Sequence, residues 1–203
     1  MAARSHRRSR RRWWTAPAAR PAWYGPARSQ PRSCARPHHA SSETREHMKL
    51  LFVCTGNTCR SPLAEAIARK VAIERGLLDI EVASAGTSAW DGAPASDGAL
   101  LVGMERRLDL SGHRSRQLTR TIVAESDLIF TMGPHHLERV EALGARGKAF
   151  LLTAFPDAGP VGRAISDPMG GELDVYRTTA DELETEVRRV FDRLAAERVP
   201  GAS

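Results

Sequence analysis

The sequence predicts a single doubly wound α/β domain, in which a four-stranded parallel sheet is flanked by helices on both faces. From Met48 onward, short apolar runs alternate with longer stretches of helical period, which is the pattern of parallel α/β proteins. The first run, residues 50–53, is continuously apolar, as expected of a strand covered on both faces. A chain of 203 residues has room for one such domain with a sizeable core, and is too short for two typical ones.

The elements of the N-terminal half follow from local signals. A helix is predicted from Pro62, because proline is favoured at the first helical position. Its apolar face consists of Leu63, Ala66, Ile67 and Val71. Residues 80–83 are predicted as the second strand, which ends in Ser84-Ala85-Gly86. A helix over about residues 96–107 leads to a loop at Gly112-His113.

The C-terminal half contains two further strands and two helices. Residues 128–132 and 149–152 are predicted as strands, and residues 134–143 as the helix between them. The last helix has the clearest pattern, because its apolar residues recur at i, i+4, i+7, i+8 and i+11. These residues are Leu183, Val187, Val190, Phe191 and Leu194. We expect this stripe to be core rather than a surface for a partner.

Residues 1–47 are predicted to be a disordered, Arg- and Pro-rich tail that precedes a domain of residues 48–199; residues 200–203 form a short second tail. The long tail has eleven Arg against Glu43 and Glu46, a net charge of +9, which leaves about −3 for the rest. With few aliphatic residues it cannot offset its ordering entropy. Three interpretations stay open: a true start at Met48, an organelle transit peptide, or contact of its tryptophans with nucleic acid or anionic lipid.

Composition excludes several classes of protein. Three cysteines do not make a disulfide framework, which suits a reducing compartment. No window approaches the roughly 18 consecutive apolar residues of a membrane span, and the tail lacks the apolar core of a secretory signal. Because the basic charge lies in the tail, a nucleic-acid-binding body is not indicated. The expectation is a cytoplasmic protein that makes no membrane contact.

The segment LLFVCTGNTCRSPLAEAI carries the chemistry. It places Cys54 and Arg60 in the turn between the first strand and the first helix. Such a turn points successive backbone N–H groups at one spot, where the helix N-terminus adds positive charge, and so predicts an anion site. Gly56 permits a tight turn or a close approach to the anion, and Asn57 tolerates left-handed backbone angles.

A cysteine in that turn is expected to be nucleophilic. The same amides and Arg60 stabilise the thiolate of Cys54, and Ser61 can donate its hydroxyl to it. The planar guanidinium of Arg60 can hold two phosphoryl oxygens at once, which a lysine cannot do with the same geometry. The competing interpretation of Cys54 is an inert buried thiol at a strand end.

At these residues the sequence resembles the low-molecular-weight protein tyrosine phosphatase family, whose loop has the form Cys-x-Gly-Asn-x-Cys-Arg-Ser-Pro. Here it is Cys54-Thr-Gly-Asn-Thr-Cys-Arg-Ser-Pro62, and a second family element, an Asp-Pro pair in a late loop, is Asp167-Pro168. The resemblance implies that Asp167 protonates the leaving group and then activates water. It implies that the loop binds substrate through Thr55, Gly56, Asn57, Thr58, Cys59 and Ser61.

The resemblance also implies supporting roles. Ser84 and His113 are expected to hold Asn57 in place, a structural role that we favour for His113 over that of a catalytic base. Cys59 can form a disulfide that protects Cys54 from over-oxidation, or can simply pack beneath the loop. His135 and His136 have no metal-ligand spacing with the cysteines, so we expect a solvated helix face there, with no metal and no cofactor.

The closest resemblance is to the bacterial protein arginine phosphatase branch. That branch shares Thr55, Thr58 and the run Asp167-Pro-Met-Gly-Gly171 followed by Asp174 and Tyr176, except that it has an aromatic residue in place of Met169. Its residue matching Thr58 favours phosphoarginine. We therefore predict a phosphoprotein phosphatase that leans to phosphoarginine, with phosphotyrosine as the alternative.

Other classes fit less well. A thioredoxin-coupled arsenate reductase relays electrons through further cysteines, and none follows Cys59. A non-catalytic phosphate-binding module is expected to lack the nucleophile, the arginine or the acid, and all three are present. The expected partners are phosphorylated proteins or peptides; nucleic acid would bind only through the tail, and the protein is expected to be a monomer or weak dimer.

Overall fold

The structure, a computed structural model, describes residues 47–155 and 162–197. The predictions of a disordered tail before Met48 and of a short tail over 200–203 concern parts outside these residues, apart from the exposed His47. In the described part, no helix is both long enough and apolar enough to cross a membrane.

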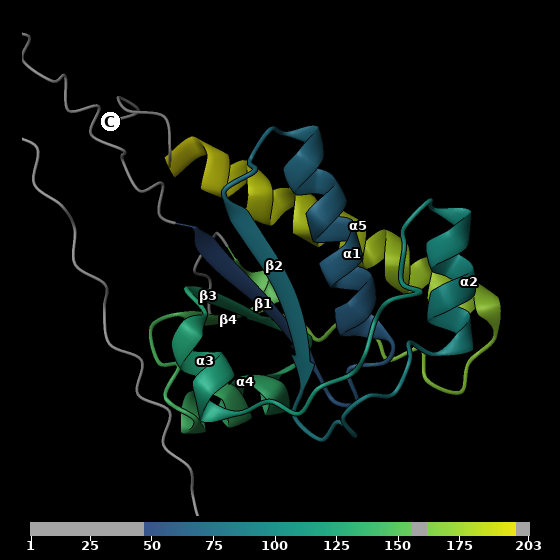
Figure 1. Cartoon of the computed structure of the whole chain (residues 1–203), viewed down its shortest axis with the longest axis horizontal. Coiled ribbons are helices and arrows are strands. Elements are labelled where there is room, and N and C mark those ends of the chain that lie inside the picture. Colours follow the sequence, from purple (N-terminus) through teal and green to yellow (C-terminus); the bar gives the residue numbers. More distant parts are fainter. Residues whose placement is uncertain (1–46, 156–161, 198–203) are drawn as a thin grey trace, which may run out of the picture. The chain divides into compact units, whose positions relative to one another are not determined.

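A four-stranded, wholly parallel sheet forms the centre of the domain, as predicted (Figure 1). Its strands are β1 (Met48–Cys54), β2 (Ile80–Gly86), β3 (Leu128–Thr131) and β4 (Ala149–Leu151), in the order β2-β1-β3-β4. The chain thus builds one edge from β1 to β2 and then crosses to β3 on the other side of β1. The carboxyl end of β1 therefore lies at the switch point where α/β sheets bind ligands.

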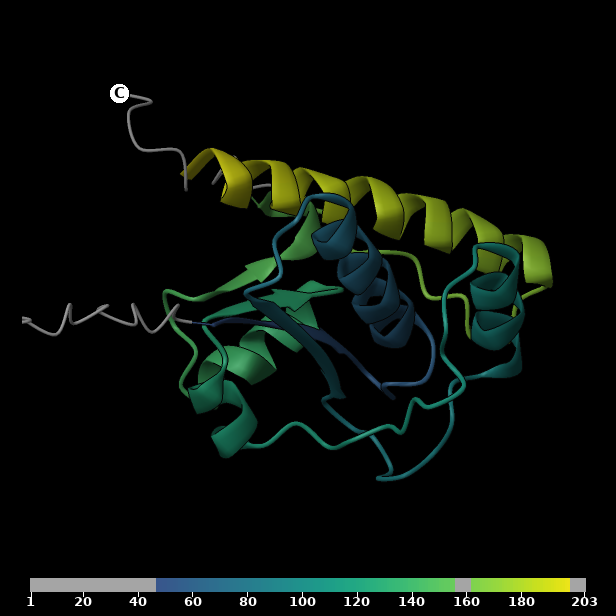
Figure 2. The ribbon, with the colours of Figure 1, turned by 45° about the horizontal axis from the view of Figure 1, so that its top comes forward.

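Helices cover both faces of the sheet, because the side chains of β1 alternate between two cores (Figure 2). Leu50 and Phe52 belong to the core under α1 (Arg60–Glu74), α2 (Asp97–Glu105) and α5 (Leu173–Glu197). Leu51 and Val53 belong to the core under α3 (Arg120–Glu125) and α4 (Pro134–Ala142). This burial on both faces explains the continuous apolar run of β1.

The prediction for the last helix is confirmed. All five residues of its apolar stripe are buried, and they pack in the same core as α1. The stripe therefore fixes the long α5 against the sheet, and with it the segment just before α5 that carries Asp167.

Helix α1 begins at Arg60, two residues before the predicted start at Pro62. Proline is tolerated there because the first-turn N–H groups of a helix have no partner within the helix. Cys59 precedes the helix with φ −118° and ψ −84°. The first helical residues, Arg60 and Ser61, therefore directly continue the turn after β1.

Other boundaries differ from the predictions by small amounts. The helix predicted over 96–107 covers Asp97–Glu105: Ser96 caps it by accepting from Ala99 N, and Arg107, at φ 57°, is left-handed. The short α3 was missed; it has only six residues, and among them only Val123 is buried. Strands β3 and β4 end one residue early, the latter in a turn of 3-10 helix, η1 (Leu152–Ala154).

Candidate active site

The loop between β1 and α1, residues 55–59, which we call the phosphate loop, surrounds the sulfur of Cys54, the last residue of β1. Cys54 is buried, and its Sγ accepts a hydrogen bond from the backbone N of Asn57 at 3.2 Å. Ser61 Oγ, in the first turn of α1, lies 3.0 Å from the same sulfur. The cysteine therefore stands where amide hydrogens and the positive end of a helix converge, a place that favours an anion.

Asn57 connects the loop to its surroundings through several hydrogen bonds. Its backbone is left-handed, with φ 56°, and its side chain is fully buried. Its Nδ2 donates to Ser61 Oγ at 2.9 Å and to Ser84 Oγ at 2.8 Å. Its carbonyl oxygen lies 2.7 Å from His113 Nε2, and its Oδ1 accepts from the backbone N of Arg116 at 2.9 Å. The structure thus brings Ser84 and His113 to Asn57, and adds Arg116.

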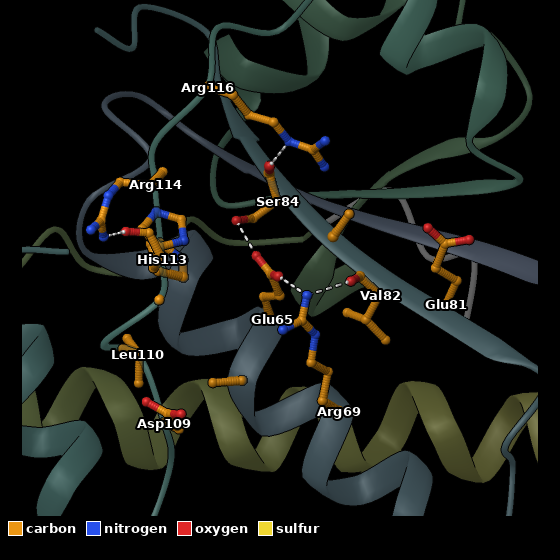
Figure 3. Close-up of a pocket in the computed structure, with 14 residues that line it drawn as sticks. Glu65, Arg69, Glu81, Val82, Ser84, Asp109, Leu110, His113, Arg114 and Arg116 are labelled. Carbon is orange, nitrogen blue, oxygen red and sulfur yellow. Dashed lines mark hydrogen bonds and ion pairs between the residues drawn. The ribbon is translucent and has the colours of Figure 1, made fainter. Parts of the chain in front are cut away.

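These hydrogen bonds have a direction. Both hydrogens of the Asn57 amide are used, so Ser61 and Ser84 each accept from it and keep their own hydroxyl hydrogen for another partner. Ser84 donates its hydrogen to Glu65 Oε2 at 2.5 Å (Figure 3). Ser61 is left to donate to Cys54 Sγ, which stabilises the thiolate form of the sulfur.

Arg60 and Asp167 meet beside the cysteine. Arg60 is buried, and its Nη2 donates to Asp167 Oδ2 at 2.5 Å while its Nη1 donates to the carbonyl of Ile165 at 3.2 Å. Its buried Nε has no partner in the described part of the chain. The other carboxylate oxygen, Asp167 Oδ1, accepts from Met169 N at 3.2 Å. The late loop is therefore held over the phosphate loop by an ion pair that is open to solvent on the aspartate side.

These groups line one small pocket. Its residues are Cys54, Thr55, Gly56, Thr58, Cys59, Arg60, Asp167 and Met169. Seven of these eight were predicted from the sequence as site residues. Asn57 and Ser61, predicted with them, do not line the pocket but lie buried beneath the loop, where they support it. Within residues 47–155 and 162–197, no cluster of three or more His, Cys, Asp or Glu could hold a metal.

The expectation of a solvated helix face at His135 and His136 is wrong for His136. His135 is exposed, but His136 is fully buried, and its Nε2 lies 2.9 Å from Thr55 Oγ1 in the phosphate loop. Two adjacent residues of a helix point in different directions, so α4 can expose His135 and bury His136. Burial, with smaller contributions from His135 and Arg60, lowers the pKa of His136 to about 4.

This burial predicts a pH dependence of stability. His136 has a pKa near 6.5 when unfolded and about 4 when folded, so the unfolded chain binds its proton first. The free energy of unfolding should therefore fall by about 3 kcal/mol as the pH drops from 6.5 to 4. Urea unfolding across this range measures it. His136→Gln should flatten the slope, whereas His135→Gln should not; equal slopes in all three proteins would contradict the assignment.

The sulfur of Cys59 contacts Ser96, the cap of α2, and Tyr176 in α5. Its Sγ donates to Ser96 Oγ at 3.2 Å and lies 3.6 Å from the hydroxyl of Tyr176. Burial raises the pKa of Tyr176, so this hydroxyl stays neutral. Cys54 and Cys59 are both free thiols. Packing beneath the loop therefore accounts for Cys59 in this structure, and its role as a disulfide partner stays a prediction.

The fold and this loop are those of a cysteine-dependent phosphatase. The family model described as low molecular weight phosphotyrosine protein phosphatase matches residues 49–199. The chain therefore belongs to this family. It is 37% identical over 153 residues to a protein-arginine-phosphatase of Bacillus subtilis, an alignment that covers 74% of this chain and 99% of that protein.

Two further relatives show the breadth of the family. The low molecular weight protein-tyrosine-phosphatase PtpB of Staphylococcus haemolyticus is 39% identical over 137 residues, which cover 67% of this chain and 92% of PtpB. The solved structure of the YwlE arginine phosphatase from Geobacillus stearothermophilus matches with a TM-score of 0.68 and 37% identity, over 74% of this chain and 95% of that one. Both kinds of phosphatase are thus similar to this chain.

Proposed function

We propose that the protein removes phosphate from phosphorylated arginine in proteins, with Cys54 as nucleophile, Arg60 as phosphate ligand and Asp167 as general acid and base. The observation that carries this proposal is the position of Cys54 Sγ. It accepts hydrogen bonds from Asn57 N and Ser61 Oγ in a pocket that Arg60 and Asp167 also line. Nucleophile, anion ligand and acid thus share one small space.

The first step transfers the phosphoryl group to sulfur. The thiolate of Cys54 attacks phosphorus, an S–P bond forms, and the bond from phosphorus to the guanidinium nitrogen breaks. Asp167 gives its proton to that nitrogen, because a guanidine that is expelled without a proton leaves as an anion and is a poor leaving group. The phosphoryl oxygens replace Asp167 as the partner of Arg60, which frees the carboxyl group for this proton transfer.

The second step regenerates the enzyme. Asp167, now a carboxylate, takes a proton from water, which attacks phosphorus and breaks the S–P bond. The electron pair returns to Cys54 as a thiolate, which Ser61 and the Asn57 amide stabilise. Because the nucleophile must be a free thiol, we place the protein in a reducing compartment, the cytoplasm.

Phosphoarginine is favoured over phosphotyrosine by two observations. The curated relatives include protein-arginine-phosphatases that this chain matches over nearly their whole length. In addition, Thr58 lines the pocket beside Cys54. Its hydroxyl can accept a hydrogen bond from the N–H groups of a guanidinium, whereas a phenol ring offers no donor at that place. Phosphotyrosine is the second candidate, because PtpB is similarly related and Met169, exposed on the rim, can contact a ring.

The test is kcat/KM of the full chain on peptides that differ only in phosphoarginine or phosphotyrosine. We expect a preference for phosphoarginine, and no activity on either in Cys54→Ser. Thr58→Val removes the hydroxyl at constant volume, so it should lower kcat/KM for phosphoarginine about tenfold and leave phosphotyrosine unchanged. A tyrosine preference would select the second candidate, and activity that survives Cys54→Ser would overturn both.

A further inference from the structure

A second and larger pocket lies next to the phosphate loop. It has a volume of about 530 Å³ and is formed by α1, β2 and the segment 109–116 (Figure 3). It shares no lining residue with the pocket of Cys54. Its size is that of a site for a small molecule, and the proposed reaction does not use it.

The acidic and basic side chains of this pocket differ in whether they already have a partner. Each of its three carboxylates already has a partner: Glu65 accepts from Ser84 and Arg69, Asp109 accepts from Ser111, and Glu81 lies 3.9 Å from Lys49.

Two of its arginines are different. Arg114 donates only to the carbonyls of Ser111 and His113, and the side chain of Arg116 donates only through Nε, to the carbonyl of Ser84. Neither forms an ion pair with a carboxylate of residues 47–155 or 162–197. The groups of the pocket that can still bind a ligand are therefore positively charged hydrogen-bond donors.

The sheet edge adds backbone donors. Thr87 N donates to Cys54 O, and Met48 N donates to Asp79 O, so the odd-numbered residues of β2 turn their backbone groups toward β1. Val82 and Ser84 consequently turn theirs to the open edge, where Arg69 and Arg116 bond their carbonyls. The N–H groups of Val82 and Ser84 lie on the same edge, in the wall of the pocket.

The wall of this pocket is also the support of the catalytic loop. Three of its residues hold Asn57: Ser84 through Oγ, His113 through Nε2 and Arg116 through its backbone N. Asn57 in turn bonds Cys54 directly and through Ser61. A ligand that contacts Arg116 or Ser84 is therefore linked to Cys54 through a single residue, Asn57.

We propose that this pocket binds a phosphate dianion and that the bound phosphate slows the enzyme through Asn57. Two guanidinium groups with unused N–H donors, together with two backbone amides, suit the four oxygens of a phosphate better than the two of a carboxylate. The bound dianion competes with the carbonyl of Ser84 for the Arg116 guanidinium, and so shifts Ser84 and the backbone of Arg116, both of which hold Asn57. The inhibitory part rests on the proposed function, because phosphate is the product of that reaction; the binding part does not.

Binding is tested with inorganic phosphate on the full chain by isothermal titration calorimetry. We expect two saturable sites in the parent protein, and one in Arg114→Ala/Arg116→Ala. Arg139→Ala removes an exposed arginine on α4, across the sheet, and should keep both sites. Because every variant has the same tail, its arginines cannot produce a difference. An unchanged number of sites in the double variant overturns the proposal, whether or not the protein is active. A titration with O-phosphoserine in place of phosphate tells whether the pocket also accepts a phosphate group that is esterified to an amino acid.

Kinetics test the coupling. At saturating substrate, phosphate should lower kcat about fivefold, the lower end of usual coupling between sites, in addition to competing at the active site. Arg114→Ala/Arg116→Ala should lose the effect on kcat and keep the competition. Purely competitive inhibition of the parent, or an effect on kcat that survives the double substitution, overturns the regulatory role.

Discussion

Asp167→Asn should lower kcat on a phosphoarginine peptide by about 10²–10⁴, the usual contribution of a positioned general acid. The amide cannot donate a proton to the leaving nitrogen, yet it has nearly the same shape as the carboxylate. Its single oxygen can accept from Met169 N or from Arg60 but not from both, so the late loop should keep one of its two bonds to Asp167. Single-turnover measurement of the burst of released peptide isolates this step from the hydrolysis of the phosphocysteine.

A matched control is Asp174→Asn, which changes a nearby exposed aspartate that pairs with Arg177 on α5. It should leave kcat within about twofold, since surface ion pairs contribute little. The defect of Asp167→Asn should shrink for an aryl phosphate with an acidic phenol, whose leaving group needs no proton. A loss of equal size on both substrates would contradict the role of Asp167 as acid and indicate a defect in folding or binding.

The sequence could predict the fold because each strand and long helix has its own apolar pattern. The continuous apolar run of β1 results from burial on both faces, and the periodic stripe of α5 results from burial on one face. The phosphate loop could be predicted because its residues are adjacent in the chain. Asp167 lies more than a hundred residues away, so only the resemblance to a known family indicated its role.

The missed residues have a common cause. Arg116 reaches Asn57 through its backbone N–H, which every residue but proline has, so no side-chain signal exists. Glu65 looks like an ordinary polar residue of α1, and its bond to Ser84 depends on the packing of α1 against β2. His136 is buried by the position of α4 under the loop. These contacts join elements whose relative placement only the folded structure defines.

Asn57→Ala should be the most damaging single change outside the pocket itself. It removes three buried hydrogen bonds of the Asn57 side chain, to Ser61, Ser84 and the N–H of Arg116, each worth about 1 kcal/mol. Alanine also has a Cβ but no side chain that can hydrogen-bond locally, so holding it at φ 56° costs about 1 kcal/mol. The free energy of unfolding should fall by about 4 kcal/mol, measured by urea unfolding.

Activity should fall even where the variant is folded. Without the amide of Asn57, Ser61 is free to turn its hydroxyl away from Cys54, and the loss of one preorganised donor costs about 10²–10³ in kcat. Asn57→Gly separates the two causes: it loses the same bonds without the left-handed strain, so it should be about 1 kcal/mol more stable than Asn57→Ala and equally slow. If Asn57→Gly restored the rate, backbone strain rather than the bonds to Ser61 and Ser84 would control Cys54.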